Sequence, residues 1–100
     1  MFGNMMGKLQ DAQQKMEDVQ RKLDKIIVIG EAQGVKVSLN ANKIVTNIDI
    51  PQVILDDGDK DQIEDLLMLA INKGIDSAEN IAKSEGASVM KGIMPNIPGF

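Results

Sequence analysis

The sequence predicts an α+β fold, in which a long N-terminal helix precedes a three-stranded antiparallel meander and a C-terminal helix. Apolar residues first recur at alternating spacings of three and four. β-Branched and alternating segments follow over residues 26–50, and a wide apolar face of helical period returns after residue 60. The 100 residues fit one domain, which we expect over residues 1–92.

The first helix is expected from about Asn4 to Ile26, because its apolar residues form the seam of a coiled coil. Glutamine, lysine and acidic residues stand between the seam positions, which suits a helix. A seam this narrow requires a partner, which is either another helix of this chain or the same helix of a second chain. The seam residues are Phe2, Met5, Leu9, Ala12, Met16, Val19, Leu23 and Ile26.

Three short strands are expected between the helices. The β-branched run over residues 26–29 precedes a glycine-bounded turn over residues 30–34. Residues 35–39 alternate between apolar and polar side chains, and a polar turn over residues 40–42 follows. Pro51 ends the third strand. The residues expected on one face of that strand are Ile44, Thr46, Ile48 and Ile50.

The second helix is expected from about Lys60 to between Ser84 and Val89, after an acidic loop over residues 56–61. Asp59 with Gln62, or Asp61 with Glu64, can form its capping box. Small residues recur every four positions on its apolar face and permit close approach of another element; they are Ala70, Gly74, Ala78 and Ala82. Gly86 weakens the prediction of the last turns. Residues 93–100 are rich in proline and glycine and are expected to be a mobile tail.

The composition excludes most catalytic chemistry. Histidine and cysteine are absent, which removes the commonest general base, the commonest metal ligand and thiol nucleophiles. The spacing of Asp57, Asp59 and Asp61 resembles half of a calcium loop, but Gln62 and Met68 stand where that loop needs glycine and glutamate. No phosphate-binding glycine motif occurs, and no apolar run is long enough for a membrane span. We therefore expect no enzyme, cofactor, metal, small-molecule substrate or membrane association.

The distribution of charge singles out the first helix. The net charge is −4, yet residues 1–48 carry seven basic and five acidic residues, whereas residues 49–100 carry four and ten. Lys8, Lys15 and Lys22 form a row, seven residues apart, beside the seam. Either this row is available to phosphates, or its lysines only stabilise the helix through acid-first pairs four residues apart. Those pairs are Asp11–Lys15, Glu17–Arg21 and Asp18–Lys22.

In this order of segments, the chain resembles the bacterial YbaB/EbfC family of nucleoid-associated proteins. The resemblance rests on the opening MFGNMMGKLQDAQQKMEDVQRKL, on GEAQGVKVSLNANKIVTNIDI, on DQIEDLLMLAINKGIDSAENI and on the ending PNIPGF. It implies a tweezer-like homodimer, in which the strands form the body and the long helices project as arms. It also implies binding to double-stranded DNA with little sequence preference and a change in DNA conformation, in the cytoplasm and nucleoid.

The resemblance attributes DNA contacts to the helices. The matching positions here are Lys8, Lys15, Arg21, Lys22, Lys25, Lys73, Lys83 and Lys91. The single arginine and the lack of an aromatic platform argue against base reading, so we expect phosphate contacts to dominate. The alternative hypothesis is a homodimeric, non-enzymatic module that binds another protein through its helical arms or its apolar tail.

Overall fold

The computed structural model describes the backbone of residues 2–93 and the side chains of residues 7–89. Its elements are α1 (Phe2–Lys25), β1 (Ile27–Ala32), β2 (Val35–Asn40), β3 (Val45–Asp49), α2 (Gln52–Asp57) and α3 (Lys60–Ile93). The strands form one antiparallel sheet in the order β1-β2-β3. The predicted order of helix, meander and helix is confirmed.

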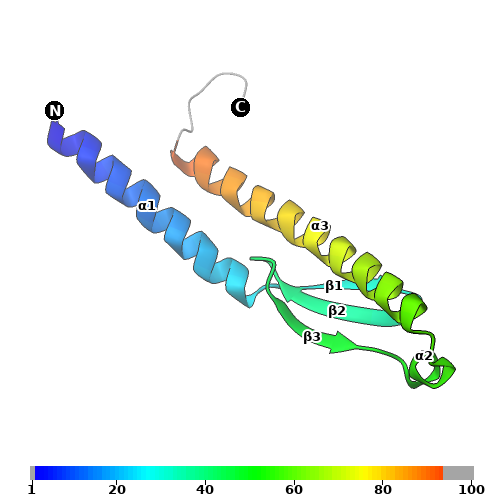
Figure 1. Ribbon diagram of the computed structural model, residues 1–100. Coiled ribbons are helices and arrows are strands. Elements are labelled where there is room, and N and C mark those ends of the chain that lie inside the picture. Colours follow the sequence, from blue (N-terminus) through cyan, green and yellow to red (C-terminus); the bar gives the residue numbers. More distant parts are fainter. Residues whose placement is uncertain (1, 94–100) are drawn as a thin grey trace.

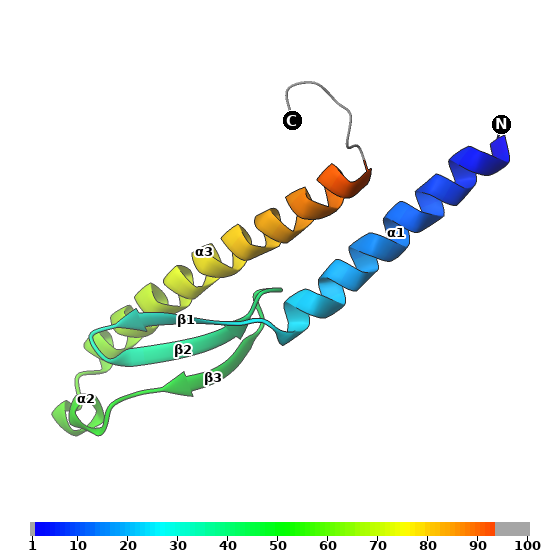
Figure 2. The ribbon, with the colours of Figure 1, turned by 180° about the vertical axis from the view of Figure 1, so that it is seen from behind.

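Two long helices give the molecule an extended shape. α3 crosses one face of the sheet and continues past it beside α1, so that both helices project from the same end (Figures 1 and 2). The radius of gyration is 19.3 Å, whereas a compact chain of this length has about 13 Å. We call α1 and the part of α3 after Ala78 the arms, and we call the sheet, α2 and the rest of α3 the body.

The apolar core lies between α3 and the first two strands. Val35, Val37 and Leu39 of β2 have no exposed surface. They share one apolar cluster with Leu66 and Ala70 of α3. Alternate side chains of β1 and β2 point toward α3 and form most of the buried core. This is the pattern of a sheet that is covered on one face only.

Two glycines bring the backbones of β1 and α3 together. A Cβ atom at Gly30 would lie 1.8 Å from the carbonyl oxygen of Ala70 and 2.6 Å from the backbone nitrogen of Gly74. A Cβ atom at Gly74 would lie 2.1 Å from Cδ1 of Leu39. The small residues of α3 therefore permit the close approach that their spacing predicted, and the approaching element is β1.

The expected turn over residues 30–34 is wrong, because Gly30 lies inside β1. The pairing of β1 with β2 continues as far as Ala32, which stands opposite Val35. Only Gln33 and Gly34 form the turn, and their φ angles of 49° and 92° have the positive sign that two-residue hairpins favour. From the sequence alone, Gly30, which is needed for packing against α3, cannot be distinguished from a glycine that is needed for a turn.

The predicted face of β3, formed by Ile44, Thr46, Ile48 and Ile50, is also wrong. Val45 stands opposite Leu39, but Asn47 stands opposite Ser38, so Thr46 is an extra residue in a bulge. The bulge shifts the alternation by one position, and Val45 and Ile48 share the side of the sheet on which α3 lies. Simple alternation along the sequence does not reveal a bulge.

β3 is nevertheless uncovered on both faces. All five of its residues are exposed, because α3 packs against β1 and β2. The exposed fractions of Val45 and Ile48 are 41% and 47%. One apolar strand at the edge of the sheet therefore has no covering element within the described chain.

The short helix α2 was not expected, since the sequence indicated only a strand end and an acidic loop in this region. Pro51 stands at its N-cap position with φ −57°, which suits the start of a helix. Ile54 turns into the apolar core. Gly58 then ends the helix in the left-handed conformation, with φ 66°.

α3 begins as predicted and ends later than predicted. The backbone N–H of Gln62 donates to Oδ1 of Asp59 at 3.1 Å, which confirms Asp59 as the N-terminal cap. The helix passes through Gly86 and reaches Ile93, beyond the expected end between Ser84 and Val89. Ile93, the first residue of the predicted tail, is therefore helical, and residues 94–100 lie outside the described residues.

The contact of β1 with α3 leads to a prediction for two glycines. We expect Gly30→Ala to lower the free energy of unfolding by about 2 kcal/mol or more, because the added Cβ meets fixed backbone atoms of α3. We expect Gly86→Ala to raise it by about 0.5–1 kcal/mol, because nothing lies within 4 Å of that Cβ and alanine favours a helix. Urea titration followed by far-ultraviolet circular dichroism, at one protein concentration, measures both. Similar effects of the two substitutions would contradict the close contact.

Candidate nucleic-acid interface

The base of α1 is held by a second apolar cluster. Val19 and Leu23 are buried there with Ala41, which has 1% exposed surface. The backbone N–H of Ala41 donates to the carbonyl oxygens of Leu23 at 3.1 Å and Ile26 at 2.9 Å. Ile81 of α3 packs against the same cluster. The last turns of α1 are therefore fixed to the sheet and to α3 together.

The turn between β2 and β3 adds polar contacts to this base. Nδ2 of Asn42 donates to the carbonyl oxygen of Gln20 at 3.0 Å and to the Asp24 carboxylate. The turn itself is held by Oδ1 of Asn40, which accepts from the backbone N–H groups of Asn42 at 2.9 Å and Ile44 at 3.1 Å. These asparagines therefore orient α1 relative to the sheet.

The seam of α1 divides into two halves, which differ in how far they are buried within this chain. The half near the base packs inside the chain, through Val19 and Leu23. Toward the N-terminus, Leu9 and Met16 are 64% and 44% exposed. The described residues of the outer half of the seam are therefore largely exposed.

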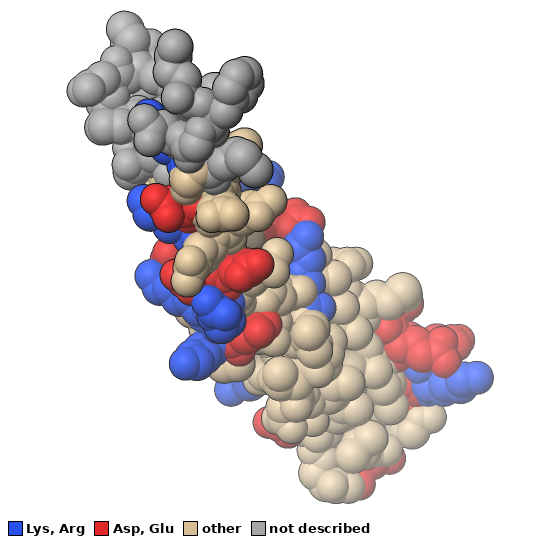
Figure 3. All heavy atoms as spheres, turned by 90° about the vertical axis from the view of Figure 1, so that its left-hand side faces the viewer, with Lys and Arg blue, Asp and Glu red and all other residues tan. Residues whose placement is uncertain are grey.

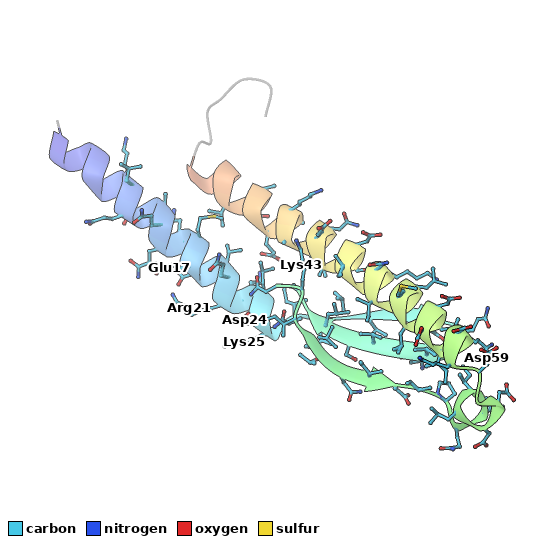
Figure 4. The ribbon with its side chains drawn as sticks, in the orientation of Figure 1. Glu17, Arg21, Asp24, Lys25, Lys43 and Asp59 are labelled. Carbon is cyan, nitrogen blue, oxygen red and sulfur yellow. The ribbon has the colours of Figure 1, made fainter. Side chains whose placement is uncertain are left out.

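Basic side chains lie along the outside of α1. Lys8, Lys15 and Lys22 are exposed and follow one another beside the seam. Arg21 and Lys25 project from the side of α1 that faces away from α3, together with Glu17 and Asp24 (Figure 4). The structure thus brings the five predicted basic residues of the first helix onto one arm, where basic and acidic side chains are interleaved (Figure 3).

Two of these basic residues have acidic partners. Nζ of Lys22 lies 3.0 Å from Oε2 of Glu85 on α3, and Arg21 pairs with Asp18, one turn earlier in the helix. The expected pairs Glu17–Arg21 and Asp18–Lys22 are therefore wrong, because both bases have other partners. The Lys22 side chain is 60% exposed, and such surface pairs contribute only about 0–1 kcal/mol. This pair therefore contributes little to stability.

The predicted basic residues of α3 are not all brought to the arms. Lys83 is exposed on the arm portion of α3. Lys73 lies over the body, where its Nζ donates to the carbonyl oxygen of Glu31 at 3.1 Å. Because β1 runs away from α1, this contact lies at the end of the sheet that is remote from the arms. Lys91 belongs to α3, but its side chain lies outside the described residues.

Lys43 is a basic residue at the arms that sequence reasoning did not select. It follows Asn42 in the β2–β3 turn, and its Nζ lies 3.2 Å from Oε1 of Glu79 on α3. Its φ of 70° places it in the left-handed region, which fixes the direction of the turn. The predicted polar turn covered residues 40–42 and ended one residue before Lys43. The closeness of Lys43 to the arms is therefore evident only from the structure.

Acidic residues gather at the opposite end of the molecule, in α2 and the first turns of α3 (Figure 1). They are Asp56, Asp57, Asp59, Asp61, Glu64 and Asp65. The five basic residues of α1 stand against four acidic ones. The net charge of −4 therefore arises at the end that is distant from the arms.

In the described residues, no group of three or more acidic side chains is placed to hold a metal ion. Among the described helices, none is long and apolar enough to cross a membrane.

The comparisons with known proteins agree with this architecture. The YbaB/EbfC DNA-binding family matches residues 1–93. A nucleoid-associated protein of Chlorobium phaeobacteroides is 39% identical over 95 residues, which cover 93% of this chain and 84% of that protein. Another, from Flavobacterium johnsoniae, is 39% identical over 98 residues, which cover 96% of this chain and 91% of that protein.

A crystal structure of an uncharacterized protein from Helicobacter pylori has the same fold, with a TM-score of 0.80 over 90% of this chain and 97% of that chain. Its identity of 23% supports the fold alone. The match over residues 1–93 and the two relatives confirm the resemblance seen in the sequence. This family is one of nucleoid-associated DNA-binding proteins and not of enzymes. The chain belongs to the YbaB/EbfC DNA-binding family.

Proposed function

We propose that this protein is a homodimer that binds double-stranded DNA through lysine contacts to phosphates, with little sequence preference, and that it alters DNA conformation in the nucleoid of the cytoplasm. The row of Lys8, Lys15 and Lys22 carries the proposal, because it runs along an arm that is fixed at its base and exposed beyond it. Lysine suits phosphate because its ammonium group is a point charge on a flexible stem. Seven-residue spacing distributes these charges along the helix.

The excess acidic charge of the chain lies too far from the arms to oppose this binding strongly. Salt screens charges that lie more than about 10 Å apart at about 0.1 M ionic strength. The molecule is 68 Å long, and its excess acidic residues lie at the end opposite the arms. A phosphate at the outer half of α1 therefore interacts with Lys8 and Lys15 and only weakly with the acidic end.

Contacts to phosphates, without reading of bases, fit the remaining side chains of the arms. Arg21 is the single arginine of the chain and is already paired with Asp18, whereas guanine reading relies on a free guanidinium. No aromatic side chain is described on either arm for stacking against bases. DNA affinity should consequently depend on salt and vary little with sequence.

A second copy of the chain is proposed to cover β3. Val45 and Ile48 are exposed at the edge of the sheet, and α2, which follows directly, adds exposed Val53 and Leu55. Exposed apolar strands at a sheet edge are a hazard unless another element covers them. Two copies joined through their bodies would present four helical arms to DNA, which would allow contacts at more than one point along the duplex.

The second candidate function is a protein-interaction module. The exposure of Leu9 and Met16 favours it, because an apolar stripe on a projecting helix suits a protein partner better than a phosphate backbone. The two functions differ in which side chains they need. Lysine substitutions weaken the first, whereas polar substitutions at the seam weaken the second.

The lysine row is tested by removing two charges. We expect Lys8→Gln with Lys15→Gln to weaken binding to a labelled random duplex about tenfold at low salt, because two phosphate contacts per chain are lost. The slope of log affinity against log salt should become less steep by about 0.9 for each contact removed. Fluorescence anisotropy between low and physiological salt measures both quantities.

The control for that test is Lys36→Gln with Lys60→Gln, which changes the net charge equally. Lys36 lies in β2, and Lys60 lies at the acidic end, paired with Glu64. We expect this variant to bind DNA like the parent. If both variants lost the same DNA affinity, the loss would be due to net charge and not to particular lysines. If DNA binding were unchanged after Lys8 and Lys15 are replaced, these two lysines would be excluded as contacts.

The ion pair between the arms gives a prediction of opposite sign. We expect Glu85→Gln to tighten DNA binding about threefold at low salt, because Lys22 loses its acidic partner and becomes available to a phosphate. Glu64→Gln is the matched control, since it also breaks an exposed lysine pair but does so at the acidic end. The same anisotropy titration distinguishes them. Weaker binding after Glu85→Gln would mean that the pair positions the arm for DNA.

Dimer formation through β3 is tested by placing a charge on it. We expect Ile48→Asp to convert a dimer into a monomer of 10.9 kDa, because a buried carboxylate at the interface costs several kcal/mol. Asn72→Asp, on an exposed position of α3, should leave the dimer intact. Light scattering after gel filtration gives the masses. A parent protein that is already monomeric would contradict the homodimer, and a dimer that survives Ile48→Asp would place the interface elsewhere.

A further inference from the structure

We infer that Lys43, in the turn between β2 and β3, is a further phosphate contact for DNA, made from the junction of the two arms. The inference rests on the proposed function and extends its contact surface from the helices to a turn. Lys43 lies at the end of the sheet where both arms begin, and its side chain points toward the arm portion of α3 (Figure 4). Asp59, at the acidic end, lies at the far end of the sheet in the same view.

The backbone of Lys43 is held in place without the help of its side chain. Its N–H donates to the carbonyl oxygen of Asn40 at 2.9 Å, and the N–H of Asn40 donates to the carbonyl oxygen of Ile44 at 2.9 Å. Oδ1 of Asn40 also accepts from the N–H groups of the residues on either side of Lys43, which are Asn42 and Ile44. The turn therefore forms through Asn40 and the backbone, and the lysine side chain is not needed for it.

The conformation of this turn is unfavourable for a lysine. Lys43 has a φ of 70°, in the left-handed region where a Cβ atom is crowded and where glycine is favoured. Its side chain pairs with Glu79, but the two side chains are 46% and 42% exposed, and pairs this exposed contribute little to stability. Strained residues of this kind are concentrated at binding sites. The position therefore favours a lysine that serves binding over one that serves folding.

The turn is bonded directly to the base of α1. The N–H of Ala41 donates to the carbonyl oxygen of Leu23 at 3.1 Å, and Nδ2 of Asn42 donates to the carbonyl oxygen of Gln20 at 3.0 Å. Lys43 thus has a fixed position relative to the lysines of α1. A phosphate bound at this turn would set the position of the whole arm on the duplex, which is the role of backbone contacts in DNA binding.

The pairs of Lys43 and Lys22 with α3 indicate how far apart two bound phosphates would be. Their partners, Glu79 and Glu85, are six residues apart, or about 9 Å along the helix axis. Each strand of B-DNA carries one phosphate per about 3.4 Å of its axis. Two ammonium groups at this separation can therefore contact phosphates a few nucleotides apart on one strand. In the free protein the two glutamates occupy these lysines, and phosphates would take their places.

Replacing Lys43 by glycine tests the inference, because glycine removes the ammonium group and tolerates the positive φ. In the full chain, we expect Lys43→Gly to weaken binding to a labelled random duplex about threefold at low salt. The slope of log affinity against log salt should become less steep by about 0.9 for each contact removed. The midpoint of urea unfolding should not fall, and Lys43→Arg should keep the affinity of the parent. Fluorescence anisotropy and urea titration measure these quantities.

Two control variants separate the ammonium group of Lys43 from its ion pair and from net charge. Glu79→Gln breaks the same pair but keeps the lysine, so we expect an affinity equal to that of the parent or higher. Lys60→Gln removes a lysine that is paired with Glu64 at the acidic end, and we expect it to bind like the parent. If either control weakened binding as much as Lys43→Gly does, the inference would be overturned.

The remaining outcomes distinguish this inference from the proposed function. Unchanged affinity of Lys43→Gly, together with weaker binding of the variant that lacks Lys8 and Lys15, would overturn the inference and leave the proposed function standing. A loss of affinity that comes with a lower urea midpoint and persists in Lys43→Arg would assign Lys43 to holding the turn. A parent protein that binds no duplex at low salt would refute both.

Discussion

The backbone contact of β1 with α3 at Gly30 and Gly74 determines where the other elements lie. With no Cβ atom at either position, α3 rests directly on β1 and covers β2, so the part of α3 within the body lies along the first two strands and is not centred on the sheet. Two consequences follow from this placement. β3 remains uncovered, and the last part of α3 extends beyond the sheet as an arm, where it meets α1.

The arms depend on a small junction at their base. Val19, Leu23 and Ala41 bury the apolar part of it, and Asn42 adds hydrogen bonds from the β2–β3 turn. Beyond this junction, the described contacts between the helices include the exposed pair of Lys22 with Glu85. The interactions that fix α1 therefore lie at its base, whereas the outer half of the helix carries exposed charges that have little part in folding.

The separation of charge along a long molecule explains how an acidic chain can present a cationic arm. Asp59 caps α3, the neighbouring acidic residues suit the positive end of the α3 dipole, and all of them lie at the opposite end of the molecule from Lys8. Uncovered apolar surfaces are separated in the same way. Val45 and Ile48 lie on the body, whereas Leu9 and Met16 lie on the arm, so assembly through the body and contacts of the arm can be changed independently.

The sequence by itself determined the class of fold, the first helix, the hairpin strands and the Asp59 cap, because these depend on period and on neighbouring residues. The family followed from the resemblance of whole segments to known proteins. It also selected the lysines of α1, since their spacing is local. Only the tertiary structure decided that Gly30 packs against α3 instead of turning the chain, that Thr46 forms a bulge, that Lys73 lies away from the arms, and that Lys43 joins them. The physical reason is that each of these depends on which segments, distant in the sequence, come within contact distance, and the register of β1 on α3 sets those distances.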